Sequence, residues 1–166
     1  MKTICLTSMA VVFLFFSTIK IKAQTNQKSL KQFELMKQFI GTWNDNMGKD
    51  TTTIWELTPF GNAMESNFNS TTKGKNLYTG KQFFGYDKKT DKIISAQLYK
   101  YSAIIEFYAF WFTSDNICFA VPYQDISNPE NAILQFKFEI KSPDLFTRTI
   151  TSDNKITNVR TYTRVK

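Results

Sequence analysis

The sequence contains no histidine, and this absence excludes several kinds of functional site. A Ser-His-Asp or Cys-His nucleophile, a His-ligated haem and a mixed Cys/His zinc site all require an imidazole. No Gly-rich phosphate loop and no cluster with metal-ligand spacing can be found along the chain either. We therefore expect no metal and no cofactor.

Cysteine is also scarce, with only Cys5 and Cys118 among 166 residues. Cys5 lies in an N-terminal segment that we expect to be removed, so Cys118 is left without a partner for an intramolecular disulfide. Its neighbours Ile117 and Phe119 favour a buried apolar residue over a reactive thiol. Stability must therefore come from a hydrophobic core.

Long apolar runs are limited to residues 4–19, which follow Lys2 and precede the short stretch Lys20-Ile21-Lys22-Ala23. A basic start, an apolar middle and a small residue before a cleavage point are typical of a signal peptide, here residues 1–23. The alternative is a retained anchor, but this run is shorter than the roughly 18 to 20 residues of a spanning helix. We expect a secreted or periplasmic protein with no stable membrane span.

Positive charge is in excess, but only mildly once this segment is removed. The segment carries three of the 21 basic residues and none of the 14 acidic ones, which lowers the net charge from +7 to +4. The basic residues are scattered, so we expect no nucleic-acid partner. Residues 24–32 are predicted to form a flexible leader, and residues 33–166 a single domain with one core.

The spacing of apolar residues changes from a helical pattern to a strand pattern soon after the start of this domain. Residues 30–40 carry them at helical spacing, and Gly41 predicts the end of a short helix. Beyond it, segments rich in Thr, Ile, Phe, Tyr and Trp alternate with polar turns, which indicates strands. The predicted strands are 51–58, 62–71, 77–86, 93–101, 104–113, 117–123, 132–141, 145–151 and 156–165. An all-β antiparallel meander of about 8 to 10 strands is expected to close into a barrel, because closure removes the exposed edges.

Three short motifs resemble those of a known superfamily. Gly41 and Trp43 stand one residue apart at the start of the first strand, directly after the helix, and the chain ends in Arg160-Thr161-Tyr162-Thr163-Arg164. This order resembles the lipocalin-like (calycin) barrels, and the motif Phe83-Phe84-Gly85-Tyr86-Asp87 is similar to a bacterial family of lipocalin-like domains without assigned function. The resemblance implies that Trp43 closes one barrel end and that an arginine, preferably Arg164, packs across its ring. Such a contact is a cation–π interaction.

The inside of such a barrel decides what it does, because a barrel of this size either fills itself or holds one small ligand. The stretch 104–112 is apolar on both faces, so only one of the faces can line the interior. Our candidates for aromatic side chains that line a cavity are Trp55, Phe84, Tyr86, Tyr99, Tyr108, Trp111, Phe136 and Phe138. For each of them, a place in the packed core is the alternative.

Charged residues on apolar strands are the sharper clue, since a buried charge needs a partner. Glu56, Glu106 and Arg148 are such residues, and each either points inward or faces water. If Arg148 points inward, its guanidinium can bind the carboxylate of a fatty acid or a similar amphiphile. We therefore predict a protein that binds a small hydrophobic or amphipathic molecule.

Two other classes of function stay open. A filled core, with no cavity above about 300 Å³, would favour an envelope interaction module whose surface does the work. Relatives on the barrel that the sequence resembles include a few isomerases and cyclases. A carboxylate beside a tyrosine of perturbed pKa, or two convergent carboxylates, would favour an enzyme.

Overall fold

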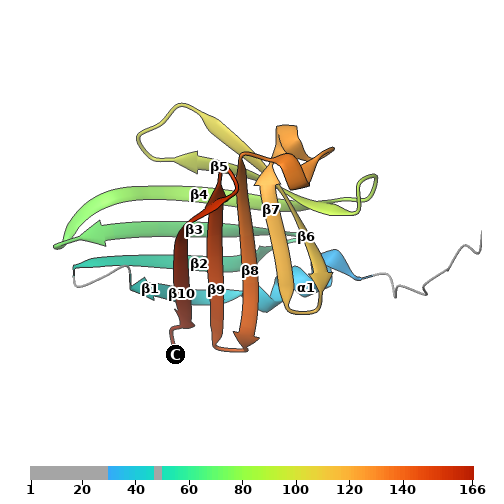
Figure 1. The fold of residues 1–166 in the computed structure, drawn as a ribbon. Helices are drawn as coiled ribbons and strands as arrows, with labels where there is room; N and C mark the ends of the chain where they lie inside the picture. The colour runs from blue at the N-terminus through green and yellow to red at the C-terminus, as the bar shows by residue number, and fades with distance from the viewer. Residues whose placement is uncertain (1–29, 47–49) are drawn as a thin grey trace, which may run out of the picture.

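Ten strands in the described part of the chain form one closed antiparallel barrel (Figure 1). The computed structural model describes residues 30–46 and 50–166. The expected signal peptide and most of the expected leader lie outside these residues. The elements are α1 (Gln32–Met36), a 3₁₀ turn (Lys37–Phe39), β1 (Gly41–Asn46), β2 (Thr51–Phe60), β3 (Ala63–Thr72), β4 (Lys75–Asp87), β5 (Lys92–Tyr99), β6 (Ile105–Ser114), β7 (Ile117–Pro122), two further 3₁₀ turns (Tyr123–Asp125 and Pro129–Asn131), β8 (Leu134–Ser142), β9 (Leu145–Ser152) and β10 (Lys155–Arg164).

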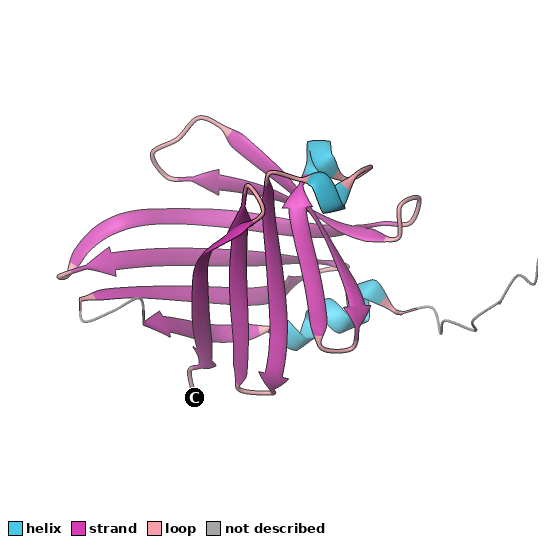
Figure 2. Cartoon of the chain, viewed as in Figure 1, coloured by secondary structure: helices cyan, strands magenta, loops and turns pink. Residues whose placement is uncertain are grey.

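The predicted all-β meander with a short N-terminal helix is confirmed (Figure 2). Each of the nine predicted strands is present, with both ends within two residues of the predicted positions. The tenth strand, β1, is indicated in the sequence only by its tryptophan, because Gly-Thr-Trp-Asn-Asp-Asn shows no apolar alternation. β1 pairs with β2 on one side and with β10 on the other, so this weakly patterned strand closes the barrel.

The N-terminal helix is shorter than predicted, because its second half tightens into a 3₁₀ turn. Met36 and Phe39 are buried in the core, next to Trp43. The predicted boundary between leader and domain, at residues 32 and 33, falls inside the helix. Gln32 is itself buried, because its side-chain amide exchanges two hydrogen bonds, of 2.6 and 3.1 Å, with the backbone of Phe112 on β6.

The two ends of the barrel differ in how they are filled. At the end beside the helix, large side chains such as Leu57, Met64, Phe112 and Phe146 pack into a continuous core. Their positions follow the strand period of two, which sends alternate side chains inward. The stretch 104–112 is apolar on both faces, and the structure shows which face is inside. On β6 the even-numbered residues from 106 to 112 face the interior.

Trp43 and Arg164 close the filled end at the seam between β1 and β10. The Cζ atom of Arg164 lies 4.1 Å from the centroid of the Trp43 ring, and the indole Nε1 donates to the carbonyl of Phe39 at 2.7 Å. The guanidinium also donates to the carbonyls of Gln38, Ile40 and Pro143. Arg164 thus ties the helix end, the turn between β8 and β9 and the last strand together.

Gly41 makes this contact possible, and its replacement tests the seam. Its φ is +131°, where side chains are strained, and a Cβ there would overlap Nη1 of Arg164. We expect Gly41→Ala to lower the free energy of unfolding by about 2 kcal/mol in urea titrations.

Gly85→Ala is the matched control, because Gly85 has an ordinary φ and a methyl group added to its Cα would meet no atom within 4 Å. We expect that substitution to change the stability by less than about 0.5 kcal/mol. Equal effects of the two substitutions would contradict the role given to Gly41.

Candidate functional site

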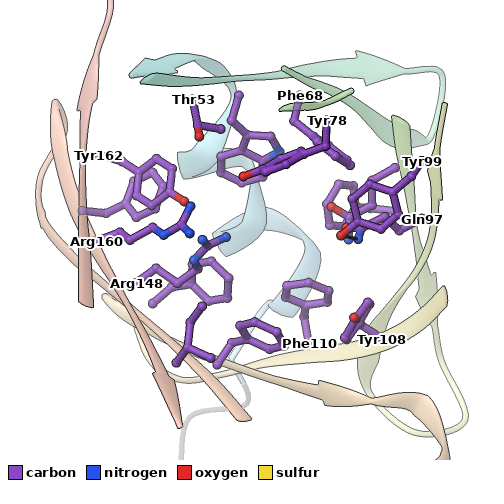
Figure 3. Close-up of a pocket in the computed structure, with 17 residues that line it drawn as sticks. Thr53, Phe68, Tyr78, Gln97, Tyr99, Tyr108, Phe110, Arg148, Arg160 and Tyr162 are labelled. Atoms are coloured by element: carbon purple, nitrogen blue, oxygen red, sulfur yellow. Dashed lines mark hydrogen bonds between the residues drawn. The ribbon is translucent and has the colours of Figure 1, made fainter. Parts of the chain in front are cut away.

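A cavity of ≈ 390 Å³ occupies the interior on the side away from the core (Figure 3). This volume lies in the usual range for small-ligand pockets, about 300 to 1,000 Å³. Every strand except β1 and β7 contributes to its wall. The lining residues are Thr53, Trp55, Phe68, Tyr78, Gln82, Phe84, Gln97, Tyr99, Tyr108, Phe110, Phe136, Phe138, Phe146, Arg148, Ile150, Arg160 and Tyr162.

The floor of the cavity is aromatic and tightly packed. Phe146 stacks on Tyr162 with ring centroids 4.5 Å apart, and its other neighbours include Trp55 and Phe138. Phe39 from the 3₁₀ turn meets Phe146 edge to face at 5.1 Å. The floor therefore rests directly on the core, and it offers an apolar surface to a ligand.

One wall of the cavity carries two arginines, Arg148 from β9 and Arg160 from β10. Arg160 is paired: its Nη1 lies 3.4 Å from the carboxylate of the buried Asp45, and its Nε donates to Asn158. Figure 3 shows both guanidinium groups close to Tyr162. This wall carries two positive charges and one carboxylate.

Arg148 is the arginine of this wall that lacks a carboxylate. No described Asp or Glu lies within 4.0 Å of it, and its buried Nε has no hydrogen-bond partner among the described residues. Its Cζ lies 5.3 Å from the Tyr162 ring centroid, a cation–π contact that leaves the donors of the guanidinium available. Such a group can bind a carboxylate with two parallel hydrogen bonds.

The opposite wall holds a hydrogen-bonded group of two tyrosines, an amide and a carboxylate. Tyr108 donates to Oε2 of Glu106 at 2.9 Å, and the side-chain nitrogen of Gln97 lies 3.2 Å from the same oxygen and 2.7 Å from the hydroxyl of Tyr99. Burial, followed by the hydrogen bond to Glu106, raises the pKa of Tyr108 well above its usual value. Tyr108 therefore stays protonated and acts as a donor.

The pKa values of Tyr78 and Asp45 both differ from their ordinary values because of the groups around them. Burial raises the pKa of Tyr78, but hydrogen bonds with Thr53, Arg160 and Ser70 outweigh it, so that the pKa is lowered. Burial also raises the pKa of Asp45, and the charges of Arg160 and Arg148 oppose this rise only in part. Both shifts reflect the combination of an apolar interior with the arginines of its wall.

Seven of the nine residues that the sequence suggested for the interior line this cavity: Trp55, Phe84, Tyr99, Tyr108, Phe136, Phe138 and Arg148. Two lie elsewhere. Tyr86 has the inward parity of Phe84, but it stands at the end of β4, where its hydroxyl donates to Asp91 in the following turn. Trp111 has the opposite parity to Tyr108, so it faces outward, stacks on Phe119 and lies under Lys92.

Ten further residues line the cavity that sequence reasoning missed. They are Thr53, Phe68, Tyr78, Gln82, Gln97, Phe110, Phe146, Ile150, Arg160 and Tyr162. Six of them stand two residues along a strand from a lining residue that the sequence did suggest: Thr53, Gln82, Gln97, Phe110, Phe146 and Ile150. The strand period of two is a signal that could have found these six.

The other charged and reactive candidates lie in different environments. Glu56 lies on the outer face of β2 and is exposed, whereas Glu106 faces the interior. Cys118 is free and buried, and burial raises the pKa of its thiol far above the usual value.

Among residues 30–46 and 50–166, no three His, Cys, Asp or Glu side chains gather as metal ligands do. No helix in that part of the chain has the length and hydropathy to cross a bilayer.

Comparison with known proteins adds no assignment. No protein-family model matches the chain, and no curated protein shows significant sequence similarity to it.

The buried hydroxyl of Tyr162 predicts a loss of stability at alkaline pH. Burial raises the pKa of this phenol to about 12 in the folded protein, whereas it is about 10 in the unfolded chain. The unfolded state therefore loses its proton first, and stability that is complete below pH 10 falls as the pH approaches 12. This loss amounts to roughly 2 to 3 kcal/mol for this one group.

Urea unfolding of the wild type and of Tyr162→Phe, over roughly pH 8 to 12, measures this contribution. Phenylalanine keeps the stacking on Phe146 and removes only the hydroxyl. We expect the stability of the variant to fall less steeply with pH than that of the wild type. Parallel pH profiles would show that Tyr162 does not titrate as a buried group.

Proposed function

We propose that the protein is a lipocalin-like carrier that binds a small amphipathic acid inside its barrel. The order of helix, Gly41, Trp43, meander and Arg164 supports the resemblance to this superfamily, and a closed antiparallel barrel is compatible with it. The ligand places its acidic group on Arg148 and its apolar body on the aromatic floor. The segment 1–23, as a cleaved signal peptide, would direct such a carrier to the periplasm or the outside of the cell.

The guanidinium of Arg148 is the observation that carries this proposal. Its Nε is buried without a hydrogen-bond partner, and the described residues supply no carboxylate within 4.0 Å. A ligand carboxylate can accept from this group, and the fixed fork of the guanidinium orients it. The neighbouring Arg160 adds to the positive potential at the same wall, although Asp45 offsets part of its charge.

The apolar body of the ligand is held by contact with aromatic rings. Trp55, Phe110, Phe136, Phe138 and Phe146 present large apolar faces to the cavity. Burial of ligand surface against them supplies affinity at about 25 cal/mol per Å², before the costs of association are subtracted. A volume of ≈ 390 Å³ limits the ligand to one small molecule.

The alternative functions are less well supported by these features. A filled-core interaction module does not need an interior space above about 300 Å³, and this cavity exceeds that size. An enzyme on this barrel would use the pair of Glu106 and Tyr108 for proton transfer. The raised pKa of Tyr108 favours a fixed hydrogen-bond donor over an acid or base at neutral pH.

Native mass spectrometry of the protein from its own compartment tests the proposal without choosing a ligand. We expect a mass above that of the polypeptide, and denaturing extraction should release one acidic amphiphile. A polypeptide mass alone, together with no binding of added alkanoates, would instead favour the interaction module.

Replacing Arg148 tests the anchor directly. We expect Arg148→Gln to weaken the binding of decanoate about tenfold to a hundredfold, because a hydrogen bond to a charged group contributes about 1.5 to 3 kcal/mol. Isothermal titration calorimetry measures the affinity. Decan-1-ol, which lacks the charge, should bind the variant and the wild type with affinities within about threefold of each other.

Lys137→Gln is the matched control, since it removes a positive charge from the outer face of the neighbouring strand β8. It should leave decanoate binding unchanged. Equal losses in the two variants would mean that net charge, and not the position of Arg148, attracts the acid.

A further inference from the structure

A second charge without an ionic partner among the described residues lies behind the cavity wall that stands opposite Arg148. Glu106 on β6 has no Lys or Arg within 4.0 Å among the described residues, and its neighbours Gln97 and Tyr108 line the cavity. Both of them bond to Oε2, and no described residue donates to Oε1. One acceptor of this carboxylate is thus left for a ligand.

Glu106 and Arg148 act on the same space from its two sides. In Figure 3, Gln97, Tyr99 and Tyr108 lie across the cavity from Arg148 and Arg160. Tyr99 experiences the charges of both walls: after burial, the carboxylate of Glu106 raises its pKa, and Arg148 lowers it. The cavity therefore has arginines in one wall and a carboxylate behind the opposite one.

Glu106 itself lines a second pocket of ≈ 420 Å³, which adjoins the cavity at Tyr108. That pocket is formed by Ile105, Glu106, Phe107, Tyr108, Pro122, Tyr123 and Gln124, and Tyr108 lines both spaces. Its rim is apolar, since Ile105, Phe107 and Tyr123 are all more than two fifths exposed. A ligand that extends from Arg148 past Tyr108 has its far end beside Glu106.

We propose that the ligand is bifunctional: an acid at one end and a hydrogen-bond donor, either a hydroxyl or an ammonium group, at the other. Arg148 binds the acid, and Oε1 of Glu106 accepts from the donor. The aromatic floor holds the apolar segment between them. This assignment rests on the proposed function, because it requires an amphipathic acid in the cavity.

Calorimetry with matched ligands tests the second anchor. The ligands are unsubstituted alkanoates and their ω-hydroxy and ω-amino analogues, in a series from hexanoate to hexadecanoate that allows for the span between the anchors. We expect at least one chain length at which the wild-type affinity for the ω-substituted acid exceeds that for the plain acid by about tenfold. We expect Glu106→Ala to abolish this preference.

Glu106→Gln identifies the kind of donor and guards against a variant that does not fold. An amide still accepts a hydrogen bond from a hydroxyl but cannot neutralise an ammonium group. A wild-type preference for the ω-amino acid that Glu106→Gln removes assigns an ammonium group, and a wild-type preference for the ω-hydroxy acid that Glu106→Gln retains assigns a hydroxyl. Glu56→Gln, on the outer face of β2, is the control and should change neither preference.

The two proposals fail in different ways. If plain alkanoates bind and the ω-substituted acids gain nothing at any chain length, the second anchor is wrong and the carrier proposal stands. A preference that survives in both Glu106 variants overturns the role of Glu106 in the same way. If no alkanoate binds at all, the carrier proposal itself fails.

Discussion

The closed seam between β1 and β10 is the constraint on which the other features depend. Among residues 30–46 and 50–166 it consists of three residue pairs, which join Trp43 to Arg164, Asn44 to Thr163 and Asp45 to Tyr162. Without it the sheet would have two edges and no interior. The same seam also supplies groups to both ends: Trp43 and Arg164 fill the closed end, and Asp45 pairs with Arg160 at the cavity wall. Closure and the positive wall are therefore products of one strand pairing.

The cavity exists because the inward side chains are unequal in size along the barrel. Near the helix they are large, and Trp43, Phe39, Phe84 and Phe146 leave no room. Further along β3 to β5, inward positions are held by buried serines such as Ser66, Ser70 and Ser95. Hydrogen bonds satisfy some of these hydroxyls, for example between Thr53 and Ser70 at 3.1 Å. Because these side chains are small, they fill little of the interior themselves, and larger neighbours such as Phe68, Gln82 and Tyr99 line the cavity.

The sequence is a good guide to the strands and a partial one to the site. Alternation in the segment from Leu134 to Ser142 is regular enough to predict both the strand and its inner face. β1 has one large apolar residue and no alternation, so only its tryptophan indicates it. Arg160, the second candidate partner for Trp43, lies in the cavity wall instead, because it is four residues from Arg164 on the same face. Pairings between distant strands, such as Asp45 with Arg160, are set by register and are not encoded in local pattern.

The charges without ionic partners are the feature of the interior that the proposed function explains. A barrel that had to be stable alone would gain little from Arg148, because its buried Nε has no hydrogen-bond partner among the described residues. Glu106 adds a carboxylate without an ionic partner among these residues, behind the opposite wall. A ligand that neutralises these charges binds the folded state alone, so its binding energy adds to the stability of the barrel. On the proposed function, the groups that would bind the ligand are those that contribute least to the stability of the barrel alone, and Arg148 would link affinity to folding.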